Sequence, residues 1–215
     1  MTRVALAAAA LAGSIVLGAC SESTTAPISG DSLELAAERS ENAAPEKGME
    51  SIAGLAIAGG YTELVGALSY VDAELGTSLV QMFAEGRDQY TVFAPTNDAF
   101  QDLYALLSFV LSAEIDEITD IDPATVAAVL EYHVVEGRRA ANSVVPRNGE
   151  RTLTPLLGET FSVRTDGTIR DGLTALEVRV DAAISAPNGS AFNGIVHEIS
   201  QVIVPPSVVA ALTGS

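Results

Sequence analysis

The order of two periodic patterns along the chain most constrains its fold. From about residue 50 to residue 136, apolar residues recur mainly at spacings of three and four, which is the period of an amphipathic helix. From about residue 151 onward, short apolar or alternating runs are separated by glycine, asparagine and aspartate, as in strands joined by turns. Helices followed by strands predict an α+β fold rather than a doubly wound sheet.

The helical half contains segments with recognisable ends. The apolar spacing predicts a helix over residues 52–68 that is interrupted by a Gly-Gly pair, and a second helix over residues 78–84. Asp122 followed by Pro123 predicts a further helix start, because aspartate caps free N–H groups and proline fits the first helical position.

The segment TVFAPTNDAF, residues 91–100, has two interpretations. Its polar residues could form a catalytic loop, or they could be the turn chemistry that starts a helix. Residues 91–94 are typical of a short strand, and Pro95 ends strand pairing. Thr96 or Asn97 can then cap a helix whose first turn contains Asp98. We predict strand, turn and capped helix, which requires no catalytic role.

The second half predicts a set of strands. The residues Thr165-Asp166-Gly167 between two such runs favour a hairpin. The closing run is the most apolar of them, and Pro205-Pro206 should end it because proline donates no ladder hydrogen bond. The expected strands cover residues 151–157, 160–164, 168–170, 176–184 and 194–204.

The first 20 residues are organised as a secretion signal that ends in a cysteine. Arg3 precedes an apolar stretch of 13 residues, which is shorter than the about 20 apolar residues of a membrane-spanning helix. The following Leu-Gly-Ala-Cys resembles the lipobox of bacterial lipoproteins, and Cys20 is the only cysteine in the chain. We predict a lipoprotein signal peptide over residues 1–19 and attachment of diacylglycerol and a fatty acid such as palmitate at Cys20. The alternative is an ordinary secretory signal with an incidental cysteine.

Composition divides the rest of the chain into three parts. Residues 20–49 are rich in Ser, Thr, Ala and Glu and contain little to bury, so we expect a flexible tether with an average span of roughly 30 Å. Residues 50–206 should form one compact domain, and residues 207–215 a C-terminal tail whose removal costs little stability. Ser21 is not the aspartate of an inner-membrane retention signal. We therefore expect an envelope protein facing the periplasm or the outside, on the outer membrane where one is present.

Charge and residue types exclude several classes of function. The net charge of -17 disfavours nucleic acid, whose binding depends on Lys and Arg. The two histidines, His133 and His197, are 64 residues apart, and neither has a second histidine at helical spacing, so we predict no metal site. The acidic residues 116–122 lack the pattern of a calcium loop. No catalytic serine elbow, phosphate-binding loop or dinucleotide fingerprint is present, so the sequence predicts neither an enzyme nor a cofactor.

Three motifs together resemble a fasciclin-like domain: TVFAPTNDAF, LEYHVVEG and NGIVHEISQVIVPP. The resemblance covers roughly residues 50–206. It implies a wedge-shaped β-sandwich with helices packed along one side, found in secreted and cell-surface proteins as an adhesion or interaction module without enzymatic activity. The expected partner is a protein or polysaccharide. An alternative is a carrier that holds a small apolar ligand in the crevice between helices and sheet.

The resemblance also draws attention to Tyr132 and His133. In fasciclin-like domains this motif is tied to adhesion, which favours an exposed contact surface. The competing hypothesis is a structural role, with Asp98 and His133 close together and His133 donating to Asp98 or to a nearby backbone carbonyl. We favour the structural role, because a neutral histidine that makes one hydrogen bond is buried at little cost.

Overall fold

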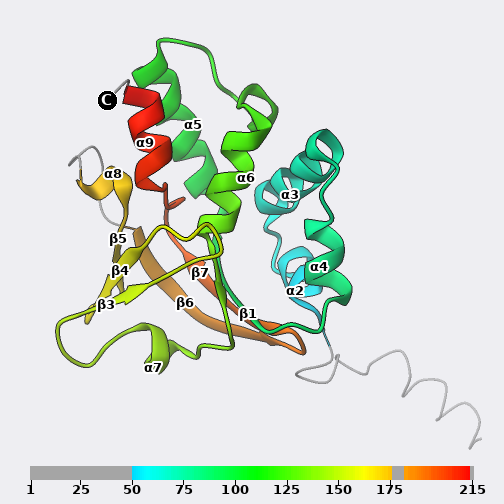
Figure 1. Cartoon of the computed structure of the whole chain (residues 1–215), viewed down its shortest axis with the longest axis vertical. Coiled ribbons are helices and arrows are strands. Elements are labelled where there is room, and N and C mark those ends of the chain that lie inside the picture. Colours follow the sequence, from blue (N-terminus) through cyan, green and yellow to red (C-terminus); the bar gives the residue numbers. More distant parts are fainter. Residues whose placement is uncertain (1–49, 176–181, 214–215) are drawn as a thin grey trace, which may run out of the picture. The chain divides into compact units, whose positions relative to one another are not determined.

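The computed structural model describes residues 50–175 and 182–213. The strands in this part of the chain form one hydrogen-bonded sheet in the order β2-β1-β7-β6-β5-β4-β3 (Figure 1). The neighbouring strands β1 and β7 are parallel, and the other pairs are antiparallel. The strands are β1 (Tyr90–Pro95), β2 (Val134–Glu136), β3 (Glu150–Leu153), β4 (Phe161–Arg164), β5 (Thr168–Arg170), β6 (Ala182–Ala191) and β7 (Gly194–Ile199).

The helices of seven residues or more occupy the first half of the domain and its last residues, and most of the helices lie to one side of the sheet (Figure 1). The predicted interruption of the first helix is confirmed, since it divides into α2 and α3 at the Gly-Gly pair. The helices are α2 (Ile52–Ala58), α3 (Thr62–Leu75), α4 (Leu79–Glu85), α5 (Asn97–Leu111), α6 (Pro123–Tyr132), α7 (Ala141–Val144), α8 (Gly172–Ala175) and α9 (Pro206–Thr213), with a 3-10 turn η1 (Ile118–Asp120).

The sheet bends so that its two halves face each other. Phe93 of β1 and Phe161 of β4 belong to strands separated by three others in the sheet, yet their ring centroids are 5.3 Å apart. Their rings belong to a second buried cluster, separate from the larger core beneath the helices. Strand β6 joins the halves and has register shifts between Ile184 and Gly189. The fold is therefore α+β, with sandwich-like packing on one side and helices on the other.

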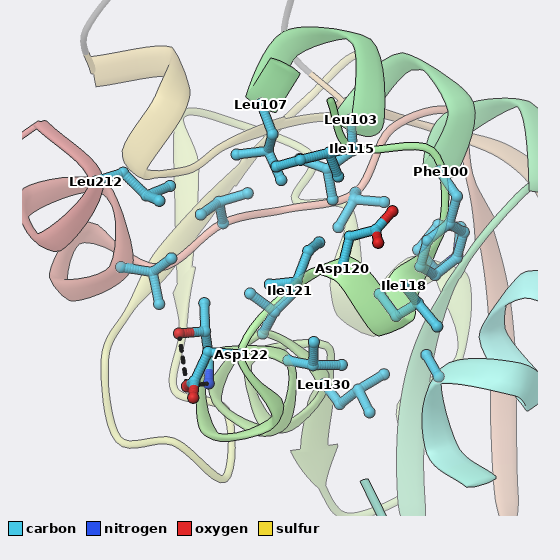
Figure 2. A pocket seen from close by; sticks show the side chains of 18 of the residues that line it. Phe100, Leu103, Leu107, Ile115, Ile118, Asp120, Ile121, Asp122, Leu130 and Leu212 are labelled. Carbon is cyan, nitrogen blue, oxygen red and sulfur yellow. Dashed lines mark hydrogen bonds between the residues drawn. The ribbon is translucent and has the colours of Figure 1, made fainter. Parts of the chain in front are cut away.

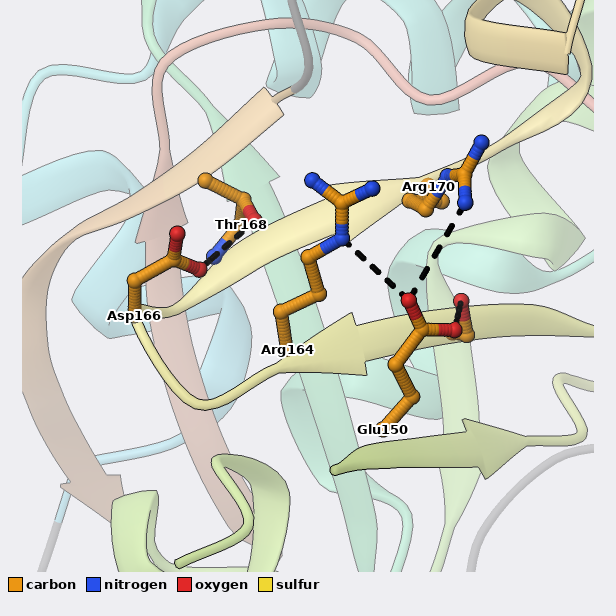
Figure 3. Close-up of polar contacts among 6 residues, drawn as sticks. Glu150, Arg164, Asp166, Thr168 and Arg170 are labelled. Carbon is orange, nitrogen blue, oxygen red and sulfur yellow. Dashed lines mark hydrogen bonds and ion pairs between the residues drawn. The ribbon is translucent and has the colours of Figure 1, made fainter. Parts of the chain in front are cut away.

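The predicted hairpin between β4 and β5 is confirmed. Gly167 has a φ of 84°, which only glycine adopts readily, and Asp166 accepts hydrogen bonds from the N–H and hydroxyl of Thr168 (Figure 3). Nearby, the Oε1 atom of Glu150 is 3.2 Å from Nε of Arg164 and 4.0 Å from Nη1 of Arg170 (Figure 3). Such exposed ion pairs contribute little stability, so the turn and the buried faces of the strands hold this part of the sheet.

Several strand boundaries differ from the prediction. Strand β3 ends at Leu153 rather than residue 157, and a proline follows two residues later. Strand β7 ends at Ile199, rather than at residue 204, although Val202, Ile203 and Val204 are buried. The prediction for residues 176–184 falls partly on residues 176–181, which lie outside the described residues.

Most of residues 207–215, the expected C-terminal tail, belong to a helix of the domain. Residues 206–213 form helix α9, in which Val208 and Val209 are buried in the larger core. Pro206 begins this helix, because a proline in the first turn lacks only an N–H that would have no intrahelical partner.

No helix in residues 50–175 and 182–213 is long and apolar enough to cross a membrane. The predicted signal peptide, Cys20 and the tether lie outside the described residues.

Candidate functional site

Tyr132 and His133 lie where α6 gives way to β2. Neither is a surface residue: the exposed fraction is 0% for Tyr132 and 2% for His133. The Tyr132 hydroxyl donates to the carbonyl oxygen of Thr160 at 2.9 Å, and its ring packs edge-on against Phe161. Tyr132 therefore anchors the end of α6 in the second core instead of presenting its ring to a partner.

His133 links the end of α6 to the segment after β7. Its Nδ1 is 2.7 Å from the carbonyl oxygen of Val129, and its Nε2 is 3.1 Å from the backbone nitrogen of Ile203. Since the Ile203 N–H can only donate, Nε2 is the acceptor, and Nδ1 carries the hydrogen that is donated to Val129. This tautomer is the neutral ring, and it joins two backbone segments that are distant in sequence.

Asp98 is exposed in the first turn of α5. The hydrogen bonds described for His133 go to backbone groups, so His133 takes the second of its two expected partners, a backbone carbonyl. The cap of α5 is Thr96, whose hydroxyl accepts from the N–H of Ala99 at 3.2 Å. TVFAPTNDAF is thus strand, turn and capped helix, as predicted.

Asn97 has a role that the sequence did not indicate. Its side-chain oxygen accepts from the N–H of Glu63 at 3.1 Å, in the first turn of α3, and its amide donates to the carbonyl of Gly60 at 2.9 Å. Asn97 therefore supplies a cap for a helix that has no side-chain cap of its own. Its neighbour Thr96 caps α5, so this short turn fixes two helices at once.

Removing the His133 ring should destabilise the fold. In His133→Ala the buried N–H of Ile203 loses its acceptor, which costs roughly 1–3 kcal/mol, measured as the free energy of urea unfolding. Asp98→Ala is the matched control, and because Asp98 is exposed we expect a loss below about 1 kcal/mol, from the weaker charge at the helix start. Equal losses in the two variants would contradict the assignment.

A cavity of about 230 Å³ lies between the helices above His133. It is almost entirely aliphatic, and Phe100 is its only aromatic hydrocarbon side chain. A cavity of about 150 Å³ with apolar walls stays dry and binds benzene. The larger cavity in this domain can therefore hold a larger apolar molecule. Figure 2 shows side chains converging on it from several elements, among them Phe100, Leu103, Leu107, Ile118, Leu130 and Leu212.

The polar groups of the cavity lie mainly on η1 and at the start of α6. Asp122 accepts from the N–H and hydroxyl of Thr125 at 3.0 and 3.2 Å, and so caps α6 as predicted (Figure 2). Asp120 accepts from two backbone N–H groups that precede η1. Because these carboxylates are occupied in local caps, the site is suited to binding an apolar molecule rather than to acid–base chemistry.

His197 is the second buried histidine. Its ring is fully buried, stacks on Phe93 with centroids 5.6 Å apart, and has Nε2 2.9 Å from the carbonyl oxygen of Arg139. Among the described residues, Nδ1 has no hydrogen-bond partner. Burial lowers the pKa of His197 below its ordinary value of 6.5, against an opposing effect of the bond to Arg139.

The lowered pKa of His197 predicts acid destabilisation. The unfolded chain takes up the proton near pH 6.5, whereas the folded chain takes it up only at lower pH. The stability that the neutral ring contributes is therefore present above pH 6.5 and is lost as the pH falls toward the folded-state pKa. Melting temperatures of the native chain and His197→Gln, measured from pH 7.5 to pH 5, should show a smaller decline in the variant. Parallel declines would contradict this role.

The described residues contain no group of three or more His, Cys, Asp or Glu side chains placed to hold a metal ion.

A family model of the fasciclin domain matches residues 59–205. This chain belongs to the fasciclin-domain family. Its fasciclin domain is 39% identical over 128 residues to Protein sll1483 of Synechocystis sp., covering 57% of this chain and 58% of that protein. It is 33% identical over 119 residues to immunogenic protein MPB70 of Mycobacterium bovis, covering 55% and 51%. To periostin of Homo sapiens it is 28% identical over 126 residues, covering 58% and 13%. The fasciclin domain thus matches only part of the length of each relative.

Proposed function

We propose that this fasciclin domain is a non-enzymatic interaction module of the cell envelope that binds a protein or polysaccharide partner. Membership of the family supports the proposal, because fasciclin domains serve in adhesion and extracellular interaction. The observation that carries it is the burial of Tyr132 and His133, whose hydrogen bonds go to backbone groups. This burial favours a structural role for Tyr132 and His133, so the partner would contact other residues of the domain.

The proposed attachment to the envelope runs through Cys20. Lipid on this residue would hold the domain on the membrane by a tether of roughly 30 Å. Cys20→Ser should release the chain from the membrane fraction without changing its melting temperature. A variant that still sediments with membranes would favour a retained signal segment instead.

Binding can be tested with the unlipidated chain. The chain carrying Cys20→Ser is passed over immobilised envelope protein and, separately, immobilised envelope polysaccharide, and binding is recorded against concentration. We expect saturable binding to one of the two surfaces that disappears when the chain is unfolded by heat. Absence of saturable binding to both would contradict the proposal.

The cavity supports a second candidate function, carriage of a small apolar ligand. Its volume of about 230 Å³ and its aliphatic walls are the specific observations in favour. The low aromatic content of the chain, 5%, is consistent with a ligand held by aliphatic contacts rather than by stacked rings.

Solvent extraction followed by mass spectrometry tests the carrier function. The chain purified from its native envelope should release an apolar molecule, and its absorbance spectrum should show any chromophore. Val126→Phe places a larger side chain in the cavity from α6, so this variant should stay folded and release none. Equal yields from the native chain and the variant would show that the molecule binds elsewhere.

A further inference from the structure

The last turn of α5 exposes three consecutive apolar side chains. Phe109 is 85% exposed, Val110 is 42% exposed and Leu111 is 41% exposed. We call these three residues the α5 tip. Phe109 is the most exposed large apolar side chain among the described residues. Exposed apolar groups that adjoin one another mark a contact surface more often than isolated ones do.

The α5 tip is continuous with the cavity. Leu111 is both partly exposed and part of the cavity lining, together with Leu107 one turn earlier in the same helix. An apolar surface therefore passes from solvent, over the tip, to the cavity interior. A partner that covers the tip also covers Leu111, which lines the cavity.

The charges near the tip select the kind of partner. Glu114, Asp116 and Glu117 follow it in sequence, and no Lys or Arg occurs between Arg87 and Arg138. Such a surface is repelled by anionic lipid or other polyanions and is compatible with an uncharged or zwitterionic surface.

We propose that the α5 tip docks the domain onto a zwitterionic lipid bilayer and so turns the side of the cavity lined by Leu111 toward the lipid. The proposal rests on the proposed lipid attachment at Cys20, because that attachment keeps the domain beside a bilayer. Phe109 and Val110 enter the interfacial region, while the acidic residues after the helix remain in water.

The size of the tip favours a bilayer over a protein partner or a second copy. A stable protein interface covers roughly 800 Å² on each partner, and three side chains supply only part of that area. Three side chains also bind a bilayer weakly, since even one myristoyl chain gives marginal attachment. The lipid attachment proposed at Cys20 would change this balance, because it would keep the domain at the surface and so raise the effective concentration of the tip there.

The sequence offers a direct optical test. The chain contains no tryptophan and one cysteine. The chain from residue 20 onward, which includes every described residue, is coupled through Cys20 to maleimide lipid in phosphatidylcholine vesicles. Phe109→Trp then carries the only tryptophan, next to the tip, and Ile57→Trp is the matched control because Ile57 is 68% exposed on α2.

Coupling to vesicles should shift the fluorescence of Phe109→Trp to shorter wavelength and expose it to quenchers placed on the lipid chains. The fluorescence of Ile57→Trp should not change. Vesicles rich in phosphatidylglycerol should give a smaller shift at low salt. No shift in Phe109→Trp, or equal shifts in both variants, would overturn the proposal.

The uncoupled chain tests whether a second copy of the chain, rather than a bilayer, covers the tip. Dimers of the uncoupled chain that Phe109→Ser abolishes would show that a second copy covers the tip, and would overturn the proposal. The maleimide bond replaces the natural lipid attachment, so the vesicle experiment does not depend on whether Cys20 is lipidated in cells. Lipidation in cells is tested separately by the fractionation of Cys20→Ser.

Discussion

Replacing Asn193 with alanine should destabilise the domain by about 2–6 kcal/mol, because two buried backbone groups lose their partners. The Asn193 side chain is fully buried. Its oxygen accepts from the N–H of Ile52 at 2.9 Å, and its amide donates to the carbonyl of Phe83 at 2.9 Å. One side chain thus joins the start of α2, the end of α4 and the turn between β6 and β7.

The free energy of unfolding in urea measures this effect. Asn148→Ala is the matched control, since Asn148 is exposed in the loop before β3, and its change should stay within about 0.5 kcal/mol. If Asn193→Ala were as stable as Asn148→Ala, the three elements would be held together by apolar packing alone.

Removal of α9 is the second large change. A chain ending at Pro205 loses Val208 and Val209 from the larger core, and burying one valine contributes roughly 1.5–3 kcal/mol. For a domain of this size the melting temperature should fall by at least about 5 °C. The cavity also loses Leu212 from its wall, so a bound apolar molecule should be released.

A chain ending at Thr213 is the control for this truncation, because it keeps the whole of α9. Its melting temperature should equal that of the native chain. An unchanged melting temperature in the shorter chain as well would support the prediction of a dispensable tail.

Local chemistry explains which parts of the fold were predictable. The helix starts at Thr96 and Asp122 follow from residues that cap N–H groups within the next three positions. The hairpin at Gly167 follows from a turn that needs a positive φ. The α+β class follows from the order of helical and strand periods.

The rest depends on contacts between residues far apart in sequence. Asn97 caps α3, whose start lies 34 residues earlier, and Asn193 bonds to residues 110 and 141 positions away. Neither residue differs in sequence from an ordinary turn asparagine. The lining residues of the cavity could not be predicted from the sequence either. The spacing that predicts an apolar helix face does not show whether the opposing side chains fill the space.

The helix at the C-terminus is also hard to predict from the sequence. The two prolines before it indicate the end of the closing strand, and Pro206 occupies the first turn of a helix. The apolar residues that follow are too few to predict a helix by periodicity. These residues form a helix that packs against α8 and the larger core, and such contacts are not visible in the sequence.

The central claim is that the domain acts by binding, while Tyr132 and His133 maintain its fold. Partner binding per folded molecule is the most direct measurement, with the folded fraction of each sample taken from its unfolding curve. We predict that His133→Ala binds the immobilised envelope partner as tightly as the native chain once its smaller folded fraction is taken into account. A fully folded His133→Ala chain that no longer binds would contradict the claim and would make His133 part of the contact surface.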